Sequence, residues 1–175
     1  MTEVKLISML NTLTNTEVFF GPQGFKNVLS VDELNKAQLG FGISELGQVV
    51  ASDDSATEEN GTWQASWQVI ARDTELGDPY FIDNNHSDLP VFTGFLADKG
   101  WEIEQVAISL TAYIACMELL LNHGQQSQAQ FVPDETSVID QGILQLLQEQ
   151  LITTSGCKHF WQMFMQCYLD WLIED

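Results

Sequence analysis

The spacing of the apolar residues changes near residue 100 of this 175-residue chain, and that change constrains the fold most. Before it, short runs alternate apolar and polar residues in steps of two, which is typical of strands. After it, apolar residues recur in steps of three and four, which is typical of amphipathic helices. The pattern predicts an α+β fold, with a mixed, mainly antiparallel sheet of about five strands packed against helices.

The first part of the chain is expected to hold the strands, separated by turns rich in glycine, proline and asparagine. The strand candidates are residues 17–20, 46–52, 65–71, 79–83 and 90–95, with a short extended piece at 26–30. Two helices are expected there as well, at residues 2–13 and 32–39. Ser30 and Glu33 have the capping-box spacing at the start of the second of these helices.

The first helix after the change of period is expected to follow an apolar stripe from Ile103 to Leu121. Glu102 and Glu104 would lie in its first turn, where negative charge complements the helix dipole. Gly124 is a residue type that commonly ends a helix. These signals predict one helix that begins near residue 102.

Two further helices are expected near the end of the chain. The helix over residues 138–151 has an apolar side composed of Ile139, Ile143, Leu146 and Leu147. The helix over residues 156–173 has two apolar stripes, Phe160, Phe164, Cys167 and Trp171 on one and Trp161, Met165, Leu169 and Leu172 on the other. We therefore expect more than one of its faces to be buried. The sheet, the preceding helix and another chain are the alternatives for what covers the second face.

The charge of the chain restricts its partners. It carries 25 Asp and Glu against 6 Lys and Arg, a formal net charge of −19 at pH 7. Direct binding to nucleic acid or to an anionic membrane depends on Lys and Arg, so neither is expected. A negative surface instead speeds the encounter with a basic protein. The alternative is that the acidity only keeps the protein soluble.

The length fits a single domain over residues 1–175. We see neither a secretory leader nor an apolar run near the ~20 residues that a membrane span needs. Cys116, Cys157 and Cys167 are an odd number without the spacing of a secreted disulfide framework. These features predict a cytoplasmic protein that does not insert into a membrane.

The usual catalytic motifs are missing from the sequence, including phosphate-binding loops, nucleophile elbows and paired metal ligands. His86, His123 and His159 are isolated, and we interpret each as a surface or capping residue. Cys157 with His159 matches no zinc spacing, and the acidic residues over 73–88 depart from the EF-hand pattern. We therefore expect no enzyme, cofactor or metal. Hydrolysis by paired carboxylates remains an alternative, because it needs only two acidic side chains at a set separation.

A set of motifs lies between residues 19 and 121. It comprises WQVIARD at 67–73, GDPYFID at 77–83, LPVF at 89–92, Trp101, a helix with Ala107, Ser109 and Tyr113, and, upstream, LSVDEL at 29–34 with Gly40-Phe41. This set resembles the Smi1/Knr4 superfamily, also called SUKH. Its members typically show a Gly-Asp-x-Tyr-x-x-Asp strand, a Pro-Val-Tyr or Pro-Val-Phe strand and a helix bearing Ala-x-Ser.

The resemblance implies a SUKH-like α+β core over about residues 19–121 that binds other proteins and catalyses nothing. Bacterial members are mainly immunity proteins that neutralise toxins, often nucleases, and fungal members regulate cell-wall synthesis. This chain departs from the family pattern in two ways. It lacks the usual amino-terminal Leu-Pro-x-x-Tyr segment with its Asn-Gly-Gly, and residues 134–175 form an added helical extension.

Charge and resemblance together predict an immunity-type inhibitor of a basic toxin such as a nuclease, whose phosphate-binding site an acidic partner would occlude. The expected contact is the face bearing the 53–60 loop and the 73–88 turns. Its candidate partner-binding residues are Asp53, Asp54, Glu58, Glu59, Asp73, Asp78 and Asp88. The alternative is a housekeeping regulator or scaffold of the Smi1/Knr4 type, acting through the Trp-rich last helix as a groove contact or a homodimer seam.

Overall fold

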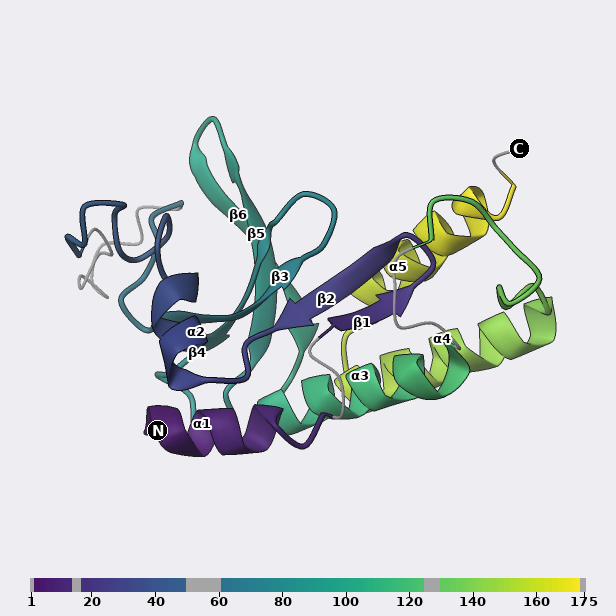
Figure 1. The fold of residues 1–175 in the computed structure, drawn as a ribbon, viewed down its shortest axis with the longest axis horizontal. Coiled ribbons are helices and arrows are strands. Elements are labelled where there is room, and N and C mark those ends of the chain that lie inside the picture. Colours follow the sequence, from purple (N-terminus) through teal and green to yellow (C-terminus); the bar gives the residue numbers. More distant parts are fainter. Residues whose placement is uncertain (1, 14–16, 50–60, 125–129, 174–175) are drawn as a thin grey trace.

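A computed structural model describes residues 2–13, 17–49, 61–124 and 130–173. In this part of the chain, six strands form one antiparallel sheet in the order β1-β2-β3-β4-β5-β6, and five helices pack around it (Figure 1). The elements are α1 Glu3–Leu10, β1 Glu17–Phe20, β2 Gln23–Asn27, α2 Val31–Ala37, β3 Trp67–Asp73, β4 Pro79–Asp83, β5 Val91–Ala97, β6 Gly100–Ala107, α3 Leu110–His123, α4 Gln141–Ser155 and α5 Lys158–Trp171. The predicted α+β fold is confirmed, with six strands where about five were expected.

The sixth strand corrects the predicted helix start near residue 102. Residues 100–107 form β6, which pairs with β5 so that Glu102 lies opposite Phe95 and Glu104 opposite Thr93. Residues 101–104 alternate apolar and charged side chains, so they fit a strand as well as the end of a helical stripe. The helix begins only at Leu110, where the Ser109 hydroxyl accepts the amide N–H of Ala112 at 3.1 Å.

The strand expected at residues 46–52 is wrong over the residues that the structure describes, 46–49. Val49 forms only an isolated bridge with Ile43. The chain turns here, because Gly47 has a φ of 77° and its amide N–H donates to the Ser44 carbonyl at 2.8 Å. A residue with positive φ interrupts an extended strand, and glycine adopts that conformation at little cost.

The capping signal before the second helix is confirmed. The Ser30 hydroxyl accepts the Glu33 amide N–H at 3.1 Å, and the Glu33 carboxylate accepts the amide N–H of Leu29 at 2.8 Å. The carboxylate thus reaches one residue further back than in the usual capping box. Both contacts orient the chain where it leaves β2 and enters α2.

The two faces of the sheet are buried by different parts of the chain. On one face, the ring of Phe25 in β2 packs against Tyr113 of α3 and against Trp161 and Phe164 of α5. On the other face, Trp63 anchors a second aromatic group. That group contains Phe41, Trp63, Trp67, Phe81 and Trp101. Tyr80 and Phe81 therefore point to opposite sides of β4, as expected for successive strand residues.

The second face of the last helix is covered by this chain itself. Trp161 of α5 is fully buried, and its indole N–H donates to the Val106 carbonyl in β6 at 3.0 Å. Tyr168 packs on Phe20 of β1 and donates its hydroxyl to the Val138 carbonyl at 3.0 Å. Cys167, which was expected on a buried stripe, is exposed. The sheet and the segment before α4 thus supply the burial that the two stripes predicted.

The apolar side predicted for the helix over 138–151 is largely wrong. The structure buries Leu144, Leu147 and Leu151 of α4, whereas Ile139, Ile143 and Leu146 are exposed. Apolar residues occupy more than half of the circumference of this helix, so their spacing is compatible with two different buried faces. Packing against α3 and α5 selects the face that carries Leu144. Within the described residues, no helix is long and apolar enough to cross a membrane.

Candidate functional site

The structure separates the acidic residues that the sequence placed on one face. Asp53, Asp54, Glu58 and Glu59 lie outside the described residues. Asp73 and Asp78 are neighbours at one end of β4, where the Asp73 amide N–H donates to the Asp78 carbonyl at 2.8 Å. Asp88 lies beyond the other end of β4, in the loop that leads to β5. Among the described candidates, only Asp73 and Asp78 are therefore brought together.

The side chain of Asp73 already forms hydrogen bonds within the turn between β3 and β4. Its carboxylate accepts the amide N–H groups of Glu75 at 3.1 Å and Leu76 at 2.5 Å. Asp73 therefore holds this turn. Partial burial raises the pKa of the Asp78 carboxyl above its ordinary value, and the charge of Asp73 adds to the effect. Asp78 is thus the member of this pair whose side chain stays available for a partner.

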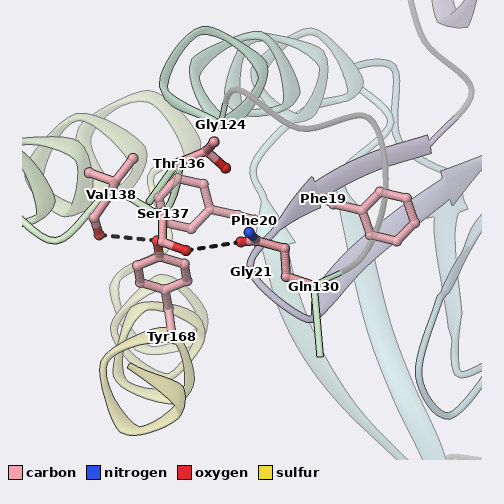
Figure 2. Close-up of a pocket in the computed structure, with 9 residues that line it drawn as sticks. All are labelled: Phe19, Phe20, Gly21, Gly124, Gln130, Thr136, Ser137, Val138 and Tyr168. Carbon is pink, nitrogen blue, oxygen red and sulfur yellow. Dashed lines mark hydrogen bonds between the residues drawn. The ribbon is translucent and has the colours of Figure 1, made fainter. Parts of the chain in front are cut away.

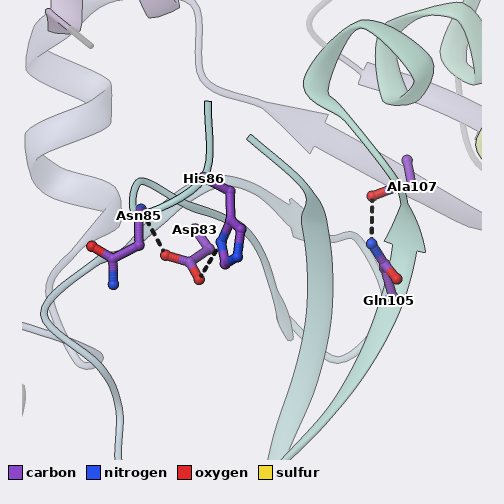
Figure 3. Close-up of polar contacts among 5 residues, drawn as sticks. All are labelled: Asp83, Asn85, His86, Gln105 and Ala107. Atoms are coloured by element: carbon purple, nitrogen blue, oxygen red, sulfur yellow. Dashed lines mark hydrogen bonds and ion pairs between the residues drawn. The ribbon is translucent and has the colours of Figure 1, made fainter. Parts of the chain in front are cut away.

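The loop after β4 is also held by an acidic side chain. Asp83 accepts the amide N–H of Asn85 at 2.9 Å and lies 3.1 Å from Nδ1 of His86 (Figure 3). The carbonyl of Asp88 accepts the amide N–H of Leu110, which ties this loop to the start of α3. At this end of the sheet, the Asp83 side chain and the Asp88 backbone therefore hold the loop, and Asp88 is exposed.

A surface hollow of about 440 Å³ lies beside Asp78, over β5, β6 and the start of α5. We call it the acidic hollow, and its lining consists of Asp78, Thr93, Gly94, Phe95, Glu102, Ile103, Glu104 and His159. The register explains part of this set, because Glu102 lies opposite Phe95 and Glu104 opposite Thr93 on adjacent strands. Residues directly opposite each other in an antiparallel pair share one face of the sheet.

Gly94 lets β5 and β6 lie close together beside the acidic hollow. It lies opposite Ile103, and a Cβ added to it would come within 2.7 Å of the Glu102 carbonyl oxygen. Any larger residue would therefore push β5 and β6 apart. Gly94 thus allows the close strand pairing that sets Glu102 opposite Phe95 and Glu104 opposite Thr93.

His159 connects the hollow to α5. Its Nδ1 lies 2.5 Å from Oε1 of Glu104, in an exposed pair that joins β6 to the first turn of α5. The sequence showed each histidine as isolated, yet His86 and His159 each meet an acidic residue, and His123 contacts the Leu119 carbonyl. Glu104 and His159 are 55 positions apart, so no local pattern signals their contact.

The chemistry of the acidic hollow suits the binding of a cation. Three carboxylates, on Asp78, Glu102 and Glu104, line a space that also exposes the apolar side chain of Phe95. Carboxylates form charge-assisted hydrogen bonds with guanidinium and ammonium groups. The ring of Phe95 can cover the methylene stem of an arginine or lysine. The hollow can therefore hold a guanidinium or ammonium group.

Two other hollows fit a partner less well. One of about 450 Å³ includes a single charged residue, Glu3, and its Gln38 side chain is already bonded to the backbone of Val69 at 2.9 Å. The other, of about 10 Å³, lies between β1, the segment before α4, and Tyr168 of α5 (Figure 2). A space of that size is comparable to one water molecule.

The buried titratable groups are poor nucleophiles. Burial raises the pKa of the Cys116 thiol to about 12 and also raises the pKa of Cys157. Burial likewise raises the pKa of Tyr113 well above its ordinary value, and its hydroxyl donates to the Asn27 side chain at 2.9 Å. Thiols and phenols with raised pKa values stay protonated at neutral pH. Over the described residues, no group of three or more His, Cys, Asp or Glu side chains is placed to hold a metal ion.

Comparison of the chain with protein-family models, with curated proteins and with solved structures finds no significant match.

Proposed function

We propose that this chain is a non-enzymatic protein-binding module of the Smi1/Knr4 (SUKH) type that acts as an immunity-type inhibitor of a basic toxin, such as a nuclease. The observation that carries the proposal is the acidic hollow on a chain with a net charge of −19. Long-range attraction would bring a basic protein to this surface, and the hollow would accept one of its side chains. The proposed place of action is the cytoplasm, where free cysteines persist as thiols.

Inhibition follows from where a nuclease carries its positive charge. Such an enzyme concentrates Lys and Arg around the site that binds phosphates. An acidic protein that pairs with those side chains occupies the position of the nucleic acid. Asp78, Glu102 and Glu104 would pair with the basic side chains, and Phe95 would pack against their methylene stems.

The alternative, a regulator or scaffold that acts through the Trp-rich last helix, gains no support from the structure. Trp161 and Trp171 of α5 are buried within the chain's own core. A partner that contacts α5 would meet its polar side, where residues such as Gln162 and Gln166 are exposed. The tryptophans cannot serve as interface anchors while the core is intact.

A capture experiment with matched variants tests the proposal. Tagged protein is incubated at low salt with an extract of its own cells, eluted with a salt step, and its partners are identified by mass spectrometry. Asp78→Asn/Glu102→Gln removes two charges from the acidic hollow. Glu118→Gln/Glu135→Gln removes two exposed charges from other surfaces and serves as the control.

We expect the wild type and the control to recover one basic toxin or nuclease that salt releases. The variant in the hollow should bind it at least about tenfold more weakly. Equal recovery by both variants would show that the hollow is not the contact. Recovery of no basic protein by the wild type would contradict the proposed function itself.

A further inference from the structure

The outer edge of β6, the last strand of the sheet, has backbone groups that pair with nothing in the fold. Ala97 and Gly100 are partners across the two-residue turn of the β5–β6 hairpin, and such partners exchange both backbone hydrogen bonds. Backbone groups face the two sides of a strand in turn, so those of Ile103 and Gln105 point away from β5. Within the described residues, neither of these two amide N–H groups meets an acceptor.

Other parts of the chain close the two ends of this edge. The Trp101 amide N–H donates to the Gly61 carbonyl at 2.8 Å, and the Val106 carbonyl accepts the indole N–H of Trp161 at 3.0 Å. The open edge between them can receive an extended segment, which would add a strand to the sheet. We propose that a short extended segment of the basic toxin binds there by backbone pairing, an inference that rests on the proposed function.

The charge along the open edge indicates which side chains that segment carries. Glu102 and Glu104 lie two positions apart on β6, so alternate side chains of an added strand would lie beside them, on the side of the acidic hollow. Glu102 makes no ion pair with any described residue, and Glu104 meets only the exposed His159. Lys or Arg at alternate positions would therefore complement this edge.

The opposite side of the edge is apolar. Ile103 is 44% exposed and points away from the two glutamates that flank it in the strand. The segment should therefore alternate basic residues with apolar or β-branched ones. A second copy of this chain fits less well, because two β6 edges would bring glutamates opposite glutamates, and like charges directly opposite destabilise a strand pair.

Hydrogen exchange of the purified full chain tests this proposal with a synthetic probe, the acetylated and amidated peptide TKTKTKT. Its lysines share one side of an extended backbone. With saturating peptide at low salt, the amides of Ile103 and Gln105 should exchange at least about tenfold more slowly by NMR, because they gain acceptors. The amides of Glu102 and Glu104 face β5 and provide the internal reference.

Two methylated peptides separate backbone pairing from attraction between charges. N-methylation of the two central threonines removes N–H groups that would face β6 when the lysines lie beside the glutamates. N-methylation of two of the lysines removes N–H groups that face the other way. Both peptides keep the charge of TKTKTKT. The threonine-methylated peptide should bind at least about tenfold more weakly than the lysine-methylated one.

The results distinguish this proposal from the proposed function. Equal binding of the two methylated peptides would overturn the added strand, and so would unchanged exchange at Ile103 and Gln105, or no binding of TKTKTKT at all. The capture experiment judges the proposed function by itself. Recovery of a salt-released basic toxin together with any of these negative results would reject only the added strand, because the acidic hollow could still bind the toxin through side chains alone.

Discussion

Arg72, the only arginine of the chain, makes structural contacts. The guanidinium lies 4.6 Å from the centre of the Phe41 ring and donates to the carbonyls of Ala37 and Leu39 at 3.2 and 3.3 Å. Burial lowers the pKa of this group from its ordinary value. Arg72 therefore fastens the end of α2 to β3, and its planar group is occupied by structural contacts. This use agrees with a surface that attracts cations rather than phosphates.

A prediction for a single residue concerns the carboxyl group of Asp78. Its folded-state pKa is raised above 3.8 by burial and by Asp73. The folded protein then binds more protons than the unfolded one between these two pKa values, so the contribution of Asp78 to stability falls as pH rises through that window. At pH 7 the ionised carboxylate opposes folding. Asp78→Asn should therefore unfold at the same or a higher urea concentration than the wild type at neutral pH.

The pH dependence separates this effect from a loss of contacts. Below pH 3.8 the carboxyl is protonated in both states of the wild type, so the relative gain of Asp78→Asn should disappear there. Urea unfolding at several pH values measures the difference in stability between Asp78→Asn and the wild type. A variant that is less stable than the wild type at pH 7 would show that the ionised Asp78 makes a favourable contact.

At the scale of elements, Ser109 reports where α3 begins. Its hydroxyl accepts the Ala112 amide N–H, so Ser109→Ala should lower the free energy of unfolding by about 1 kcal/mol. Thr111→Ala, at an exposed position within the same helix, should change it by only a few tenths of a kcal/mol. Chemical denaturation compares the two. If Ser109→Ala stabilised the protein, Ser109 would lie inside a helix that starts earlier.

Local patterns predicted the elements whose signals agree with their long-range contacts. The strand at Glu17–Phe20, the Ser30 cap and the strand at Pro79–Asp83 were all expected from their own residues. The strand at Gly100–Ala107 was missed because its pairing with β5 decides between two compatible periods. The buried side of α4 was missed for the same reason, since helix packing selects among its apolar positions.

The candidate site was less accessible to sequence reasoning than the fold. Asp78 was among the predicted residues, but Glu102 and Glu104 were assigned to a helix start. The acidic hollow forms only when β6 lies beside β5 and His159 of α5 comes to Glu104. These contacts join distant parts of the chain, and neither composition nor spacing encodes them directly.

At the scale of the whole molecule, the C-terminal helices belong to the same core as the sheet. Buried side chains from α1 to α5 form one contiguous cluster. Trp161→Ala should therefore lower the free energy of unfolding by about 3–5 kcal/mol. Met163→Ala, on the exposed side of the same helix, should have little effect.

Amide hydrogen exchange tests whether the sheet shares the stability lost in Trp161→Ala. In one cooperative unit, the slowest amides of β3 and β4 should exchange faster in Trp161→Ala by a factor that matches the lost stability. Unchanged protection of these strands would mean that α4 and α5 unfold separately from the sheet. Met163→Ala is the control, because it changes the same helix without removing a buried side chain.

The proposed function depends on recognition of a basic protein through the acidic hollow. The most direct measurement is the Kd of the captured toxin for the wild type and both charge variants, over a series of salt concentrations. We expect a Kd that rises steeply with salt, with a shallower dependence for Asp78→Asn/Glu102→Gln than for Glu118→Gln/Glu135→Gln. A Kd that does not change with salt, or an equal dependence for both variants, would contradict it.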